Sequence, residues 1–136
     1  MAWPLALVLM LGLVLRALNL GQPIVENYVG RQIPTAMVAR NLEKGSGFLR
    51  PRLDTAPFPN FFVVEPPIYQ WFAVGLRSLT GWPLEICGRS ISNLATALGA
   101  WGVFVLMDRR AGRASALAAA SAFSMLPITI RYGRAF

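Results

Sequence analysis

The stretch SISNLATALGAWGVFVLM, from Ser90 to Met107, decides the fold class of this chain. It carries no charged side chain, and it is close to the roughly 20 apolar residues that cross the hydrocarbon core of a bilayer as a helix. Gly99 and Gly102 within it allow close contact with a neighbouring helix. The stretch therefore predicts a transmembrane helix over residues 90–107.

Two further apolar segments predict two more spans. Residues 114–130 are rich in alanine and have Pro127 near their end. Residues 1–20 are interrupted only by Arg16, whose long side chain can reach the headgroups from a helix end. The alternative for residues 1–20 is a secretory signal peptide, but they lack a basic beginning and a small-x-small cleavage site.

The short turn over residues 108–113 predicts the orientation of these spans. Its sequence, DRRAGR, holds three arginines, and short loops rich in arginine stay on the cytoplasmic side. The long loop over residues 21–89 then faces the periplasm or exterior. Residues 131–136 begin a second external loop, which we expect to be truncated.

The composition excludes several other classes of protein. Apolar residues make up 55% of the chain and charged residues 14%, against roughly 25% charged in soluble domains. The net charge is +7, but the bases are scattered, which does not indicate a nucleic-acid partner. One cysteine, Cys87, and no histidine indicate neither a disulfide framework nor a metal site.

The long external loop contains two short helical patterns. Residues 33–44 predict one helix. Pro34 suits its first turn, and the sequence Gly45–Gly47 ends it. Residues 66–79 begin with two prolines and carry aromatic side chains typical of a membrane interface. The predicted fold is an all-α membrane protein of three transmembrane helices and a long external loop with two amphipathic or interfacial helices.

Several segments of the chain resemble one enzyme family. RQIPTAMVARN at Arg31–Asn41 resembles the RQxxTAxxARN stretch in the first external loop of bacterial family 39 glycosyltransferases. EPPIYQW at Glu65–Trp71 resembles their E-x-P-P-L-Y-x-W motif. FLRPRLD at Phe48–Asp54, Arg89 before a span, and IRYGRAF at Ile130–Phe136 are similar to further landmarks, in the same order. The resemblance extends over about the whole chain.

The resemblance implies a function at a membrane. These enzymes have the GT-C fold and are related to protein O-mannosyltransferases and to the aminoarabinose transferase of lipid A. They transfer a sugar, with inversion, from a polyprenyl-phosphate donor to a lipid, glycan or protein acceptor at the outer face of the bacterial inner membrane. The chain would be the N-terminal part of such an enzyme, inactive alone. No cofactor is implied, and a divalent metal is left open.

The catalytic acid is expected in the first external loop, where the family has a general base. The family's Asp-Glu pair falls on Arg31-Gln32 here, so the nearest acid is Glu26. Glu26 is the first candidate base, and a solvated loop acid is the alternative. Glu65 is the second candidate, although an acid before a helix start also stabilises the helix end. The family's second external acid falls just after Phe136.

Four arginines are candidates for binding the donor phosphate, because guanidinium binds phosphate through two parallel hydrogen bonds. Arg31 and Arg40 lie nine residues apart, so they do not share one helical face. Arg40 has an alternative partner in Glu43. Arg131 and Arg134 are three residues apart on one helical face, and their alternative is contact with headgroups at the interface.

Two other classes of function remain open. One is a small integral membrane subunit without enzymatic activity, complete at 136 residues. The other is a fragment of a transporter. An acid within a few residues after Phe136 and eight or more further spans would indicate the enzyme.

Overall fold

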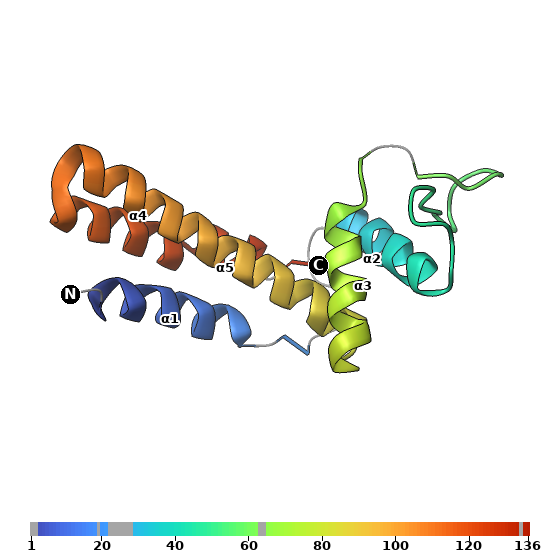
Figure 1. Ribbon diagram of the computed structural model, residues 1–136, viewed down its shortest axis with the longest axis horizontal. Helices are drawn as coiled ribbons and strands as arrows, with labels where there is room; N and C mark the ends of the chain where they lie inside the picture. The colour runs from blue at the N-terminus through green and yellow to red at the C-terminus, as the bar shows by residue number, and fades with distance from the viewer. Residues whose placement is uncertain (1–2, 19, 22–28, 63–64, 134) are drawn as a thin grey trace. The chain divides into compact units, whose positions relative to one another are not determined.

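The computed structural model describes residues 3–18, 20–21, 29–62, 65–133 and 135–136. Within these ranges the regular secondary structure is all helical, with a single isolated β-bridge between Arg52 and Phe61 and no strand. The prediction of an all-α fold is confirmed. The helices, drawn in Figure 1, are α1 (Trp3–Ala17), α2 (Val29–Glu43), α3 (Ile68–Thr80), α4 (Leu84–Met125) and α5 (Pro127–Tyr132).

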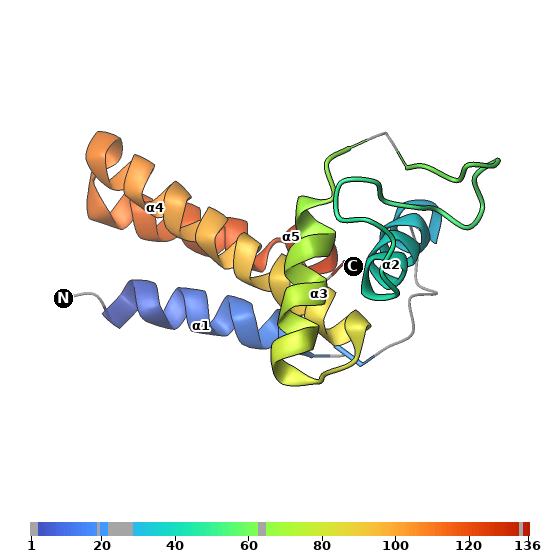
Figure 2. The ribbon, with the colours of Figure 1, turned by 45° about the vertical axis from the view of Figure 1, so that its right-hand side comes forward.

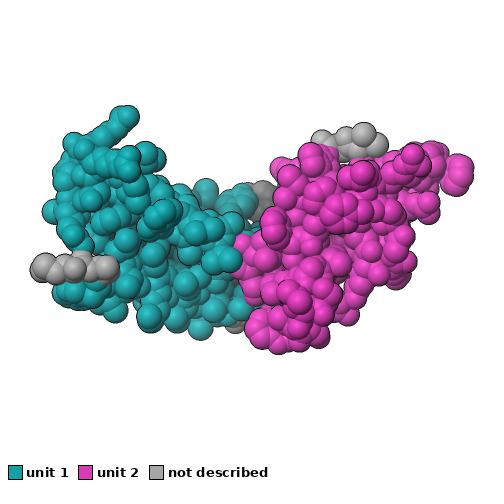
Figure 3. Space-filling view, viewed as in Figure 1, with its two compact units in different colours: residues 1–20, 92–135 teal, residues 21–91, 136 magenta. Residues whose placement is uncertain are grey.

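The chain divides into two units, coloured separately in Figure 3. Unit 1 contains residues 1–20 and 92–135. Unit 2 contains residues 21–91 together with Phe136. Helix α4 contributes its first turns to unit 2 and the rest of its length to unit 1.

Unit 1 is built around a break in α4. Gly112 has φ 77° and ψ 168°, a conformation outside the helix that glycine adopts without steric cost. The break divides α4 into two arms, 84–111 and 113–125, and the second arm turns back along the first (Figures 1 and 2). The buried core of this unit consists of Phe104, Ala116 and Ala120, with Leu5 and Val8 of α1 packed against it.

Helix α4 is, among the described helices, the one that is long and apolar enough to cross a membrane. The predicted span over residues 90–107 lies within its first arm. Helix α1 is also apolar, but its 15 described residues extend only about 22 Å, less than the roughly 30 Å of a hydrocarbon core. Three transmembrane helices therefore stay a prediction.

Unit 2 consists of α2 packed against α3, with the start of α4 closing the core. Its buried apolar side chains are Ala39, Ala73, Leu84 and Phe136. The two alanines keep the facing surfaces of α2 and α3 small, so that the helices pack closely. Helix α3 ends at Gly81, whose φ of 71° is left-handed and whose N–H bonds to the Arg77 carbonyl at 2.8 Å.

Helix α2 starts before the position that its sequence pattern indicates. The pattern begins at Ile33, whereas the helix begins at Val29 and contains Pro34. Proline has no N–H, so position 34 cannot donate to the carbonyl four residues earlier. In the same turn the Thr35 hydroxyl donates to the Arg31 carbonyl at 2.8 Å. The early start places Arg31 on the helix.

Helix α2 ends in a Schellman motif. The Ser46 N–H bonds to the Asn41 carbonyl at 2.9 Å, and the Gly45 N–H bonds to the Leu42 carbonyl at 3.0 Å. Gly45 has φ 91°, which only glycine adopts without strain. The predicted helix stop at Gly45–Gly47 therefore lies directly after α2.

Candidate functional site

Two of the candidate site residues form an ion pair in unit 2. The Arg31 Nη2 atom donates to the Glu65 Oε2 atom at 2.9 Å, joining the first turn of α2 to the segment before α3. These residues are 34 positions apart in the sequence and belong to the two motifs that carry the family resemblance. The packing of α2 against α3 brings the two motifs together.

The Arg31–Glu65 pair is open to solvent. The Arg31 side chain is 83% exposed and the Glu65 side chain 38%. Exposed pairs of this kind contribute about 0 to 1 kcal/mol to stability, because water and salt screen them. Solvent therefore reaches the guanidinium, and an incoming phosphate can compete with the carboxylate for its donors at small energetic cost.

Arg40 lies on the same helix but not on the same face. Nine residues separate it from Arg31, which places the two about half a turn apart around the helix axis. The Arg40 side chain is exposed. The alternative partner considered from the sequence, Glu43, instead accepts a hydrogen bond from Arg77 of α3. The structure thus brings Arg31, but not Arg40, to Glu65.

Phe136, the last residue of the motif IRYGRAF, also belongs to unit 2. Its side chain is 7% exposed, and its ring meets the ring of Tyr69 edge-on, with centroids 5.9 Å apart and an interplanar angle of 88°. A Cβ atom on Gly88 would lie 2.4 Å from the Phe136 ring, so the absence of a side chain at position 88 makes room for the ring. The end of IRYGRAF therefore packs on Tyr69 of EPPIYQW.

The other candidate residues lie elsewhere. Arg131 is exposed at the end of α5 in unit 1, and no described residue pairs with its side chain. Glu26 and Arg134 lie outside the residues that the structure describes. In the part of the chain that is described, no group of three or more acidic, histidine or cysteine side chains is placed to hold a metal ion.

Arg16 has a role that the sequence reading missed. Its side chain is 1% exposed, and it donates to the carbonyl oxygens of Gly12 and Ser124, each at 2.8 Å, and of Thr129 at 3.5 Å. The Ser124 carbonyl lies in the last turn of α4, where carbonyl oxygens lack helical donors. Arg16 thus ties α1 to the end of α4 rather than reaching out to headgroups.

The sequence around Arg16 did contain an indication that this side chain is buried. Arg16 is the one charged side chain within the apolar helix α1, and a charge in such a segment usually faces the interior of a bundle and has polar partners there. Gly12, one turn earlier, leaves space for the guanidinium: a Cβ atom there would lie 2.8 Å from Arg16 Nη1. The distant partners of Arg16, Ser124 and Thr129, could not be predicted from the sequence around Arg16.

No protein-family model matches the chain, and neither a curated protein nor a solved structure matches it.

Proposed function

We propose that the chain is the N-terminal part of an inverting membrane glycosyltransferase that transfers a sugar from a polyprenyl-phosphate donor to an acceptor outside the cell. One observation carries the proposal. Segments from three separate motifs, Arg31–Asn41, Glu65–Trp71 and Phe136, meet within unit 2. Segments that share one site have to meet in this way, although they lie far apart in the sequence.

The roles of the side chains follow from their chemistry. Glu26, as general base, takes the proton of the acceptor hydroxyl. The acceptor oxygen then forms a bond to the anomeric carbon of the donor sugar, and the bond from that carbon to the phosphate oxygen breaks. Polyprenyl phosphate leaves with the electron pair. Arg31 stabilises the charge that develops on this phosphate, and Glu65 holds the guanidinium in position until the donor arrives.

A membrane location is supported by the surface of unit 1. In an apolar 18-residue segment of α4, only 11% is buried inside the structure, whereas a core helix of a soluble protein is mostly buried. Large apolar side chains are exposed along α1 and α4: Leu7, Met10, Val14, Leu94, Leu98, Trp101 and Leu106. Lipid is the solvent that suits such a surface.

The proposed topology has three spans in the bacterial inner membrane. Residues 1–20 form the first span, and the two arms of α4 on either side of Gly112 contribute the second and third. The arginine-rich turn around Gly112 lies in the cytoplasm, and the loop that contains α2 and α3 faces the periplasm. Arg131 and Arg134 then lie on the same side of the membrane as this loop.

The test is a transfer assay on membranes that contain the gene product of which this chain is part. The donors are radiolabelled polyprenyl-phosphate hexoses and pentoses, and the product is label in the lipid, glycan or protein fraction. Glu26→Gln removes the base and is expected to lower transfer at least about 100-fold. Asp108→Asn, an exposed acid near the Gly112 break, is the matched control and should leave transfer unchanged.

Membrane insertion of both variants is measured in parallel by protease protection. Loss of transfer in Glu26→Gln with normal insertion supports the assignment. Transfer at the parent rate in Glu26→Gln contradicts the role of Glu26. Absence of transfer from every donor in the parent contradicts the glycosyltransferase itself.

A further inference from the structure

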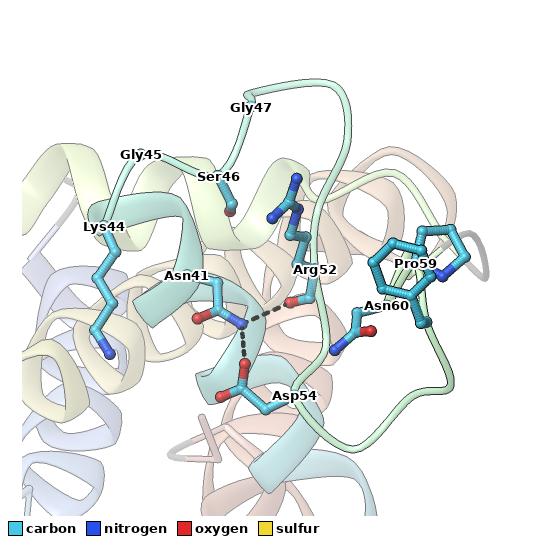
Figure 4. Close-up of a pocket in the computed structure, with 10 residues that line it drawn as sticks. Asn41, Lys44, Gly45, Ser46, Gly47, Arg52, Asp54, Pro59 and Asn60 are labelled. Carbon is cyan, nitrogen blue, oxygen red and sulfur yellow. Dashed lines mark hydrogen bonds between the residues drawn. The ribbon is translucent and has the colours of Figure 1, made fainter.

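A polar pocket of about 530 Å³ opens in unit 2, where the end of α2 meets the loop that follows it. Figure 4 shows the residues that line it. Its polar side chains are Asn41, Lys44, Ser46, Arg52, Asp54 and Asn60. Neither Arg31 nor Glu65 lines the pocket, so it is separate from the candidate site above.

Two backbone features form the walls of the pocket, the helix end at Gly45 and the β-bridge between Arg52 and Phe61. On one side, the Schellman motif at Gly45 turns the chain away from α2 and ends the helix beside Lys44. On the other side, the bridge between Arg52 and Phe61 closes the loop, and the Leu53 N–H bonds to the Asn60 carbonyl at 2.8 Å. These backbone bonds hold Arg52 and Asn60 in place without a bound ligand.

Asn41 organises the base of the pocket. It is only 9% exposed, and its Nδ2 atom donates to the Arg52 carbonyl at 3.0 Å and to the Asp54 Oδ1 atom at 2.8 Å. In Figure 4 the Asp54 carboxylate lies on the side of Asn41, while the Arg52 guanidinium lies on the side of Ser46 and Gly47. The other carboxylate oxygen of Asp54 accepts no hydrogen bond from the described residues.

Charges of both signs stay available in the pocket. Among the described residues, neither Lys44 nor Arg52 forms an ion pair with Asp54. A carboxylate accepts hydrogen bonds from hydroxyl groups, whereas a guanidinium and an ammonium donate to anions. The pocket therefore suits a ligand that carries hydroxyl donors at one end and an anionic group at the other.

We propose that this pocket binds an anionic saccharide, a sugar that carries a phosphate monoester or a carboxylate. Its hydroxyls donate to Asp54 and exchange hydrogen bonds with the Asn60 amide. Its anion accepts from Arg52 and Lys44. Phe58, which lines the pocket and is 95% exposed, offers a ring face to the C–H side of the sugar. The volume is within the usual range for small-molecule sites.

This proposal stands apart from the transfer reaction. It depends on the pocket residues alone, and it holds whether or not Arg31 and Glu26 act on a polyprenyl-phosphate donor. A phosphate and a carboxylate are two different anions that the same basic side chains can bind, and the experiment distinguishes them.

The experiment is calorimetric titration of the 136-residue chain in detergent. The probes are glucose 6-phosphate, glucuronate, glucose and inorganic phosphate. At least one of the two anionic sugars should bind saturably, and at least about 10-fold more tightly than glucose or phosphate alone. The variant Arg52→Gln should weaken this binding by about 10- to 100-fold, because it removes a charge-assisted contact.

Arg50→Gln is the matched control, because Arg50 is an exposed arginine two residues away that does not line the pocket. It should change the affinity less than about 2-fold. A second variant, Asp54→Asn, keeps an oxygen for Asn41 but removes the charge, and it should also weaken binding of the anionic sugar. Circular dichroism checks that each variant keeps its helices.

Three results would overturn the proposal. The first is no saturable binding of either anionic sugar up to about 10 mM. The second is equal weakening by Arg50→Gln and Arg52→Gln, which indicates attraction by net charge alone. The third is binding of glucose or inorganic phosphate as tightly as the anionic sugars. Binding of glucuronate alone or of glucose 6-phosphate alone identifies which anion the site takes.

Discussion

Arg16 in unit 1 and Arg31 in unit 2 lie in opposite environments. In unit 1, Arg16 is buried and its hydrogen bonds go to backbone carbonyl oxygens. In unit 2, Arg31 and Arg77 are accessible and pair with the carboxylates of Glu65 and Glu43. A buried guanidinium with fixed partners holds structure, whereas an exposed guanidinium can exchange its partner for a ligand.

The two arginines differ in whether their hydrogen-bond partners can be replaced by a ligand. The carbonyl partners of Arg16 cannot leave, because they belong to the backbone of α1, α4 and α5. The carboxylate partner of Arg31 is a side chain in contact with water. We therefore expect variants at Arg16 to act on folding and variants at Arg31 to act on binding.

The largest expected effect on stability is that of Arg16→Ala. It leaves carbonyl oxygens without donors and opens a cavity in unit 1, which should lower the free energy of unfolding by about 3 kcal/mol. The measurement is thermal unfolding in detergent, with hydrogen exchange to locate the loosened helices in α1 and the second arm of α4. Arg109→Ala, at an exposed arginine, is the control. Equal stability of the two variants would refute the role of Arg16.

Gly88→Ala should have the next largest effect, this time in unit 2. The added Cβ atom would lie 2.4 Å from the Phe136 ring, so the ring has to move, at a cost of about 1 to 3 kcal/mol. Hydrogen exchange should show loosened amides in α2 and α3. Gly75→Ala, in a helix position with nothing within 4 Å, is the matched control and should be neutral or stabilising.

A double variant sharpens this test. Phe136→Leu removes the ring that the new Cβ atom meets, so it should recover part of the stability lost in Gly88→Ala. Additive losses in the double variant would show that Phe136 does not pack on Gly88.

The smallest effect on stability is expected from Arg31→Gln. Because the pair with Glu65 is exposed, its loss should change the free energy of unfolding by less than about 1 kcal/mol, and less still at high salt. Chemical unfolding at low and high ionic strength measures this difference. A loss of stability comparable with that of Arg16→Ala would contradict the contrast between Arg16 and Arg31.

The sequence predicted the features that depend on local pattern. The apolar stretch at residues 90–107 indicated a helix, and Gly45 indicated the end of α2, since glycine adopts the left-handed conformation that a helix end requires. The arginine-rich turn between two predicted spans was also visible, but not the backbone break at Gly112 within it, which separates the two arms of α4.

The remaining features depend on contacts between distant residues. Arg16 bonds to carbonyl oxygens 108 and 113 residues away, and Arg31 meets Glu65 across 34 residues. A single sequence gives no measure of such distances, so Arg16 was assigned to the membrane edge by its local position alone. The pocket beside Asn41 was missed for the same reason, because its walls come from a helix end and a loop that folds back.

We propose that Arg31 binds the phosphate of a polyprenyl-phosphate donor. Titration of polyprenyl phosphate into the detergent-solubilised protein, followed by ³¹P NMR, tests it most directly. Arg31→Gln should weaken binding at least about 10-fold, because a charge-assisted contact is lost. Arg77→Gln, which breaks the other carboxylate pair of unit 2, should leave the affinity within about 2-fold. Equal affinities for the parent and Arg31→Gln would contradict the claim.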